Sequence, residues 1–134
     1  MKTHRDLEVW KKSIDLVADI YSLTKNYPKE ELYGLTSQIR RAAVSMPANI
    51  AEGAGRFHDK EFIQFLYIAL GSVAEIETHL VVSERLDYIC PEELEEYETK
   101  IKIIRNQTLG LIKYLKSKSV NKVTEKAYEE REDV

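Results

Sequence analysis

The 134-residue sequence contains only one cysteine, three prolines and five glycines. A single cysteine excludes a framework of intrachain disulfides and is compatible with a reducing cytosol. No stretch approaches the ~20 consecutive apolar residues of a membrane span, and the N-terminus lacks the apolar run of a signal peptide. The 23 acidic residues outnumber the 20 basic ones, for a formal charge of -3, which argues against strong nonspecific nucleic-acid binding by a monomer. We therefore expect a soluble, cytoplasmic protein with no membrane partner.

Helical periodicity runs through the whole chain, without a strand signal or an internal repeat. We predict helices from Asp6, as the capping residue, to Asn26, from a cap at Thr36 or Ser37 to Gly53 and Gly55, from His58 or Asp59 to Asp87, and from Pro91 onward. The last helix has one apolar seam, which is typical of an antiparallel bundle. The sequence thus predicts an all-α, up-and-down four-helix bundle over residues 1–116. Residues 117–134 are a charged tail that either prolongs the last helix or is disordered.

The segment from Gln38 to Arg56 differs most from an ordinary solvated helix. Its polar face contains no lysine and consists of Gln38, Arg41, Ser45, Asn49, Glu52 and Arg56. Short or planar hydrogen-bonding groups with arginine at both ends are suited to a face that meets another molecule. Pro47 lies in the middle of this segment and lacks a backbone donor. We therefore predict a kink or a break between two short helices near Pro47.

The first and third predicted helices each carry two apolar stripes, whereas an outer helix of a monomeric bundle needs only one. We assign the second stripe of each helix to contacts between subunits of a homo-oligomer. The alternative is that such a helix lies between two neighbours of its own chain. The residues assigned to the subunit interface are Val9, Leu16, Ile20, Leu23, Ile63, Leu70, Ala74 and Val81.

Few residues in the sequence suggest catalysis. His4, His58 and His79 are far apart, and none has a metal-ligand spacing to another histidine or to Cys90. Glu75 and His79 form one i, i+4 pair, which a solvated helix face explains better than a metal site does. A helix start can lower the thiol pKa of a residue such as Cys90, but no base is tied to it. We predict no metal, no cofactor, no small-molecule substrate and no enzymatic activity.

Four segments together resemble a known bacterial family. They are residues 7–12, 33–45, 49–53 and 61–66, and in order and spacing they are similar to the four-helix-bundle proteins encoded in intervening sequences of 23S ribosomal RNA genes. The resemblance covers roughly residues 6 to 115 and implies a closed four-helix bundle. Relatives, including the accessory variability determinant of diversity-generating retroelements, assemble as homopentamers, so the resemblance also implies a pentamer. His58 replaces a common Ser or Thr cap, and Asp87 replaces a frequent glycine; both departures are tolerable.

The family label states where the genes were found and leaves two functions open. In the first, a non-catalytic homo-oligomer binds RNA or a nucleic-acid-processing partner through the arginine-bearing second helix. Its phosphate contacts would be Arg40, Arg41, Arg56, Lys11, Lys12 and Lys60, repeated by symmetry. In the second, the protein is a protein-only assembly scaffold, and the second helix is used in structural or subunit contacts. Arg41 or Arg56 then pairs with Glu52.

Overall fold

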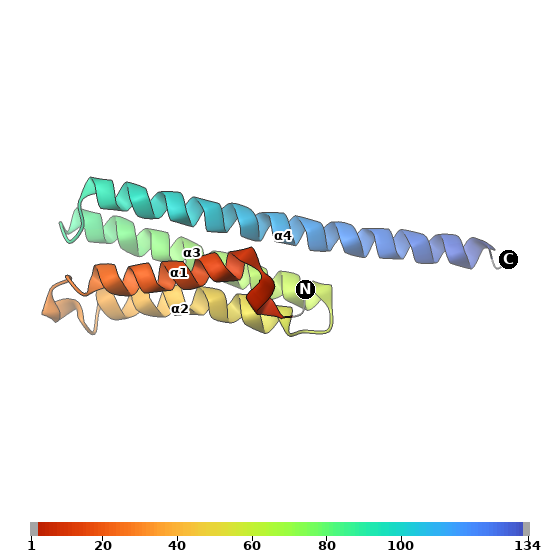
Figure 1. Ribbon diagram of the computed structural model, residues 1–134, viewed down its shortest axis with the longest axis horizontal. Helices are drawn as coiled ribbons and strands as arrows, with labels where there is room; N and C mark the ends of the chain where they lie inside the picture. Colours follow the sequence, from red (N-terminus) through yellow and green to blue (C-terminus); the bar gives the residue numbers. More distant parts are fainter. Residues whose placement is uncertain (1–2, 133–134) are drawn as a thin grey trace.

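The structure, a computed structural model, describes residues 3–132, with side chains through Lys118. Its elements in order are η1 (His4–Asp6), α1 (Glu8–Thr24), η2 (Lys29–Glu31), α2 (Leu35–Ala54), α3 (Asp59–Arg85) and α4 (Pro91–Glu132) (Figure 1). No strand occurs between residues 3 and 132. The predicted all-α fold class and its four long helices are therefore confirmed.

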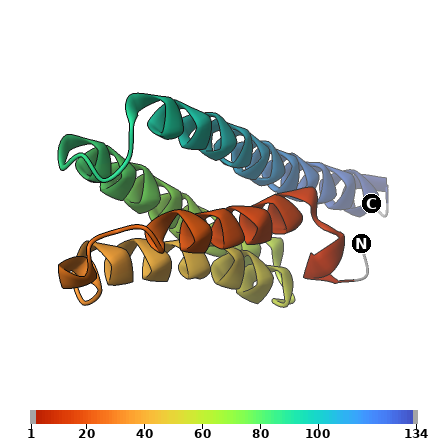
Figure 2. The same ribbon diagram turned by 60° about the vertical axis from the view of Figure 1, so that its left-hand side comes forward.

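The four long helices pack side by side in an up-and-down bundle (Figures 1 and 2). Helices α2 and α3 make the closest pair, whereas α1 and α4 make the loosest pair of neighbours. All four helices contribute to one apolar core. The largest fully buried apolar side chains are Leu16 and Ile20 of α1, Ile39, Met46 and Ile50 of α2, Leu66, Val73, Ile76 and Leu80 of α3, and Ile101 and Ile104 of α4.

Pro47 lies inside α2, and the helix continues through it from Leu35 to Ala54. The predicted break is therefore wrong, and a kink is not confirmed. Proline removes one backbone hydrogen bond and clashes with the preceding turn. Here Pro47 is buried, and apolar side chains on both sides of it, including Met46 and Ile50, are buried in the core. The free energy gained by burying these side chains along the whole helix outweighs the cost of the hydrogen bond lost at Pro47.

The first two long helices begin differently from the prediction. The Asp6 carboxylate accepts a hydrogen bond from the Thr3 backbone N–H at 3.1 Å and so completes the cap of η1, while α1 starts at Glu8. Helix α2 starts at Leu35 after Gly34, so Thr36 and Ser37 lie within the helix rather than cap it.

The end of α3 explains how the chain tolerates an aspartate where a glycine is frequent. Asp87 has a left-handed φ of 62°. The Tyr88 N–H donates to the Ser83 carbonyl at 2.9 Å, and the Asp87 N–H donates to the Glu84 carbonyl at 3.0 Å. These two bonds form a Schellman motif, which satisfies carbonyls that a helix end leaves free. The conformational cost of the left-handed residue is modest for Asp compared with most side chains.

Helix α3 is the only helix among the described residues that is long and apolar enough to cross a membrane by length and composition, although the sequence analysis expected none. Its most apolar 18-residue window has a mean hydropathy of 1.4, and 28% of that window is buried. The core helix of a soluble protein passes the same test, and α3 supplies Leu66, Val73 and Ile76 to the core. The rest of this apolar window is half-buried or exposed.

Helix α4 contains 42 residues and is the longest element. Its N-terminal part lies beside α1 and α3, and its C-terminal part extends past the other helices (Figure 1). The segment from Ser117 to Glu132 continues α4 as helix. Residues 133–134 of the predicted tail lie outside the described residues.

Candidate interaction surface

Part of the polar face of α2 is used inside the bundle. The Ser72 hydroxyl of α3 donates to the Ser45 hydroxyl at 3.0 Å. The Asn49 side chain donates to the Ser45 carbonyl at 2.8 Å and to its hydroxyl at 3.0 Å. Ser45 and Asn49 are partly buried by this arrangement. Ser45 therefore joins α2 to α3, whereas the Asn49 amide is bonded within α2.

Gly53 brings the C-terminal part of α2 close to α3. A Cβ atom at this position would lie 2.7 Å from Phe65 Cβ and 3.0 Å from Phe62 Cδ1. Such distances lie inside van der Waals contact, so only glycine fits without a shift of α3. The glycine that ends the motif from Asn49 to Gly53 is thus explained by helix packing.

Arg40 and Arg56 are held by contacts within the chain. The Arg40 Nε donates to the Thr24 hydroxyl at 2.9 Å, and its guanidinium lies 4.6 Å from the ring centre of Tyr21. The Arg56 guanidinium lies 2.6 Å from the Glu52 carboxylate and 5.1 Å from the ring centre of Phe65. Arg40 joins α2 to α1 by a hydrogen bond and a cation–π contact. Arg56 pairs with Glu52, as the second hypothesis expected.

Arg41 differs from the other two arginines. It is exposed and lines an open cleft of about 350 Å³ between α2 and α3, together with Gln38, Ala42, Ser45 and Glu75. Among the described residues, neither Arg41 nor Glu75 has a hydrogen-bond or ion-pair partner, although both border the same cleft.

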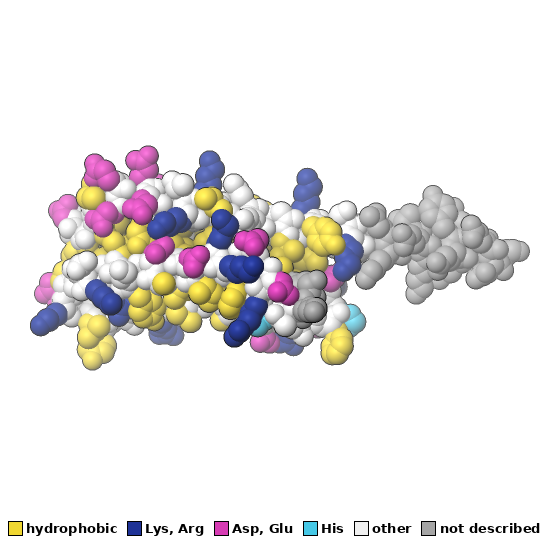
Figure 3. Space-filling view, viewed as in Figure 1, with side chains coloured by type: hydrophobic (Ala, Val, Ile, Leu, Met, Phe, Trp, Pro, Cys, Tyr) yellow, Lys and Arg dark blue, Asp and Glu magenta, His cyan; other side chains and the backbone are white. Residues whose placement is uncertain are grey.

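The three lysines predicted to bind phosphate do not line the cleft that Arg41 borders. Lys11 pairs with Glu8 at 3.3 Å. Lys12 borders a hollow of about 260 Å³ between α1 and α4, beside Asp15 and Asp19. Lys60 is exposed in the first turn of α3. The six predicted basic residues lie on three helices and the α2–α3 connection, and basic and acidic side chains alternate across the face seen in Figure 3.

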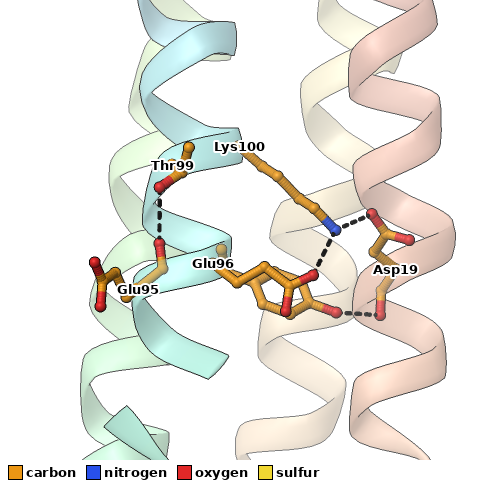
Figure 4. A network of polar contacts seen from close by, with 6 residues as sticks. Asp19, Glu95, Glu96, Thr99 and Lys100 are labelled. Atoms are coloured by element: carbon orange, nitrogen blue, oxygen red, sulfur yellow. Dashed lines mark hydrogen bonds and ion pairs between the residues drawn. The ribbon is translucent and has the colours of Figure 1, made fainter. Parts of the chain in front are cut away.

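The hollow between α1 and α4 contains a polar network that the sequence analysis did not find (Figure 4). The Tyr97 hydroxyl donates to the Asp19 backbone carbonyl at 2.8 Å, and the Lys100 ammonium lies 2.9 Å from the Asp19 carboxylate and 3.4 Å from Glu96. Burial, reinforced by the negative charge of Asp19, raises the pKa of Tyr97 to about 12. The hydrogen bond to Asp19 raises the pKa of Lys100. These contacts join α4 to α1.

The predicted subunit interface on α1 is wrong in its main residues. Val9, Leu16 and Ile20 are 4%, 1% and 0% exposed, so their own chain already encloses them. Leu23, Ile63 and Leu70 are partly buried, whereas Ala74 and Val81 are exposed. The α1 stripe that stays open includes Ile14 and Tyr21, at 41% and 40% exposure. Figure 3 shows apolar side chains along this side of α1 and α2.

The outward face of α3 has the most unusual composition. Its nine exposed positions between Gln64 and Val82 contain one charged residue, Glu75, and are otherwise uncharged: Gln64, Tyr67, Ile68, Gly71, Ala74, Thr78, Val81 and Val82. Ile68 is 51% exposed and Val82 is 40% exposed. A solvated helix face is normally rich in charged residues. This composition is typical of a surface that another protein covers.

No group of three or more His, Cys, Asp or Glu side chains in the described part of the chain is placed to hold a metal ion. Cys90 is exposed, and its thiol pKa is raised overall. A backbone hydrogen bond at Glu93 favours the thiolate, but the carboxylates of Glu93 and Glu92 and partial desolvation together outweigh it. An activated thiolate would need the opposite shift.

A family model described as 23S rRNA-intervening sequence protein matches residues 5–110. The chain belongs to this family. The predicted resemblance is therefore confirmed, and its extent agrees with the expected residues. A solved relative is a protein of unknown function from the S23 ribosomal protein family of Bacteroides thetaiotaomicron. It is 30% identical, with a TM-score of 0.73 over 78% of this chain and 95% of the relative. No curated protein matches the chain.

The match to the 23S rRNA-intervening sequence protein family covers the bundle but not the whole length of this chain. The family match ends at residue 110, within α4. Neither the family description nor the solved relative names an enzymatic activity. The segments that suggested the family include Gly53 and Ser45, which hold α2 against α3.

Proposed function

We propose that this chain is a non-catalytic scaffold that works as a homo-oligomer. The observation that carries this proposal is the outward face of α3, where Glu75 is the one charged residue among the nine exposed positions from Gln64 to Val82. Leaving such a face in water is unfavourable by ~25 cal/mol for each Å² of apolar surface. A second copy of the chain would cover it. The resemblance to homopentameric relatives makes five copies the expected number.

The scaffold version is favoured over RNA binding by the positions of the basic residues. Arg40 and Arg56 are used within the chain, and Lys11 is paired with Glu8. Affinity for phosphates grows with the number of cations that reach them together. Of the three arginines predicted to bind phosphate, Arg41 is the least engaged, and Glu75, which borders the same cleft, would repel a phosphate. The partners of this protein are therefore proposed to be further copies of itself and other proteins.

The first test is the molar mass of the purified protein, measured by light scattering. We expect a mass several times the 15.6 kDa of one chain. The double variant Ile68→Glu plus Val82→Glu should reduce the mass toward that of one chain, because two charges would then be buried at the contact. Since both side chains are exposed in the single chain, helicity and cooperative unfolding should be retained.

Leu32→Glu is the matched control. Leu32 is 49% exposed and lies directly after η2, outside α2 and α3. This variant should keep the wild-type mass. A wild-type protein of 15.6 kDa would refute self-association, whereas an oligomer that survives the double variant would show that another face makes the contact.

The RNA hypothesis is tested in the same preparation with a labelled single-stranded RNA at low and at physiological salt. We expect no salt-dependent complex. Binding that falls steeply with salt and is lost in Arg40→Ala plus Arg41→Ala, with the mass unchanged, would favour RNA as the partner instead.

A further inference from the structure

The outward faces of α2 and α3 carry opposite charges in otherwise uncharged surroundings. The exposed residues of α2 from Gln38 to Glu52 are Gln38, Arg41, Val44, Ala48 and Glu52, and Glu52 is already paired with Arg56. Arg41 is therefore the unpaired charge of this face. Glu75 is the corresponding charge of the α3 face. One face thus presents a single cation and the other a single anion.

Both charges are surrounded by side chains that favour docking. Val44, 45% exposed, lies one helical turn from Arg41, and Ile68 and Val82 lie two turns on either side of Glu75. If another copy covers these apolar side chains, water is also removed from Arg41 and Glu75. A charge that loses water needs an opposite charge, because an unpaired buried ion is strongly unfavourable.

Gly71 adds a second reason to place a helix against this face of α3. A Cβ atom at this position would meet nothing within 4 Å, so the packing of its own chain does not require glycine. Glycine inside a helix lowers helix stability relative to alanine. A partner helix that approaches closely beside Glu75 would account for it.

We propose that Arg41 of one copy forms an ion pair with Glu75 of a second copy, in an interface where the outward face of α2 packs on the outward face of α3. This inference rests on the proposed self-association and names the contact that specifies it. Arg41 then acts in protein recognition and not in phosphate binding. The guanidinium can make two parallel hydrogen bonds to a carboxylate, which fixes the register of the two helices.

The test uses the two charge reversals Arg41→Glu and Glu75→Arg in the full chain. Each variant alone places like charges against each other in the interface. We expect each to raise the dissociation constant of the assembly, measured by sedimentation, by about tenfold or more. Lys102→Glu and Glu98→Arg are the matched controls on the exposed surface of α4 and should leave the constant unchanged.

The deciding measurement mixes the two weakened variants in equal amounts. In the mixture, one variant supplies two negative groups and the other supplies two positive groups, so every contact between unlike chains is complementary. We expect the mixture to assemble more tightly than either variant alone, by about threefold or more. In a closed ring of five, at least one contact still joins like chains, so the wild-type constant is not fully recovered. A pair confined to one chain would not be restored by mixing, because each chain would keep its own two like charges.

Four results would overturn the inference. Single reversals that assemble like the wild type would show that the two charges do not meet, while self-association itself would stand. A mixture with the same dissociation constant as each variant alone would show that residues 41 and 75 interact within one chain. RNA binding that Arg41→Glu abolishes and Glu75→Arg strengthens would assign Arg41 to phosphate. A wild-type protein that is monomeric would instead refute the proposed function together with this contact.

Discussion

Gly53 determines how closely α2 and α3 approach each other. These two helices make the closest pair in the bundle, and a Cβ atom at Gly53 would lie 2.7 Å from Phe65 Cβ. Phe65 Cβ is held by the backbone of α3, so a rotation of the ring does not relieve the clash. An added methyl group must therefore separate the two helices, and the Ser45 to Ser72 hydrogen bond would be strained with them.

We expect Gly53→Ala to lower the free energy of unfolding by about 1–2 kcal/mol, since overpacking outweighs the helix propensity that alanine gains. The measurement is urea unfolding followed by far-UV circular dichroism, at one protein concentration. Gly110→Ala is the control. Nothing lies within 4 Å of a Cβ atom at Gly110, so that variant should be more stable by about 0.5–1 kcal/mol. Two variants that change stability alike would show that α2 and α3 have room at Gly53.

The sequence could single out the arginines of α2 but not assign their roles. Arg40 and Arg41 are adjacent, and helical geometry turns them ~100° apart. That rotation directs Arg40 to Tyr21 of α1 and leaves Arg41 in the cleft beside Glu75. Which neighbour each arginine meets depends on the order of helices around the core. This order is a tertiary property, so the candidate site was predicted only in part.

At the level of elements, periodicity predicted four helices and showed that α1 has two apolar stripes. It did not determine which stripe faces the core, because the angle between two stripes leaves the rotation of the helix free. The bundle buries Leu16 and Ile20 and leaves Ile14 and Tyr21 partly open. Two polar residues of α1 turn inward with them, Ser13 and Thr24, which donate to the Trp10 and Ile20 carbonyls at 2.7 Å. Such local hydrogen bonds reduce the cost of burying a hydroxyl group. A polar residue of this kind can therefore face the core although the hydrophobic pattern does not predict it.

Helices α1 and α4 pack loosely. The polar contacts between them therefore contribute a larger part of the free energy that holds these two helices together. Tyr97 and Lys100 of α4 both bind Asp19, one at its carbonyl and the other at its carboxylate (Figure 4). Tyr97 is 7% exposed, whereas the Lys100 and Asp19 side chains are 38% and 40% exposed. Solvent screens the ion pair, so the tyrosine is expected to contribute more to stability.

Tyr97 makes the stability of the bundle decrease at alkaline pH. Its pKa in the fold is about 12, against 10.0 for an unperturbed tyrosine. The folded state therefore holds the phenol proton more tightly, and stability falls as the pH rises from about 10 to about 12. We expect the wild type to lose on the order of 1–3 kcal/mol over this range through Tyr97. Unfolding by urea at several pH values measures this loss.

Tyr97→Phe separates the hydrogen bond from the titration. At neutral pH we expect it to lower the free energy of unfolding by about 0.5–1.5 kcal/mol, through the lost bond to Asp19. Above pH 10 its stability should fall less steeply than that of the wild type. A remaining decrease is expected from Tyr27, Tyr88 and Lys100, whose pKa values are also raised. Equal alkaline slopes in both proteins would contradict the assignment.

For the whole molecule, the residues that match the family and the residues of the apolar core cover nearly the same part of the chain. The family match ends at residue 110, and the last buried side chain among those described is Leu115. Lys118 still approaches Asp59, the first residue of α3, at 3.7 Å. Beyond that point the backbone of α4 extends past the other helices (Figure 1). Among the residues whose side chains are described, the contacts of α4 with the other helices therefore extend to Lys118.

A chain truncated after Lys118 tests whether the rest of α4 contributes to folding. Since the described core lies before this point, we expect the free energy of unfolding to change by no more than about 0.5 kcal/mol, as is usual for surface changes. The proposed contacts through Arg41 and Glu75 also lie in the retained part, so the molar mass should still correspond to the same number of chains. Chain number is then read by light scattering and stability by urea unfolding. If the truncated protein loses copies but unfolds as before, the C-terminal part of α4 takes part in assembly, and the interface extends beyond α2 and α3.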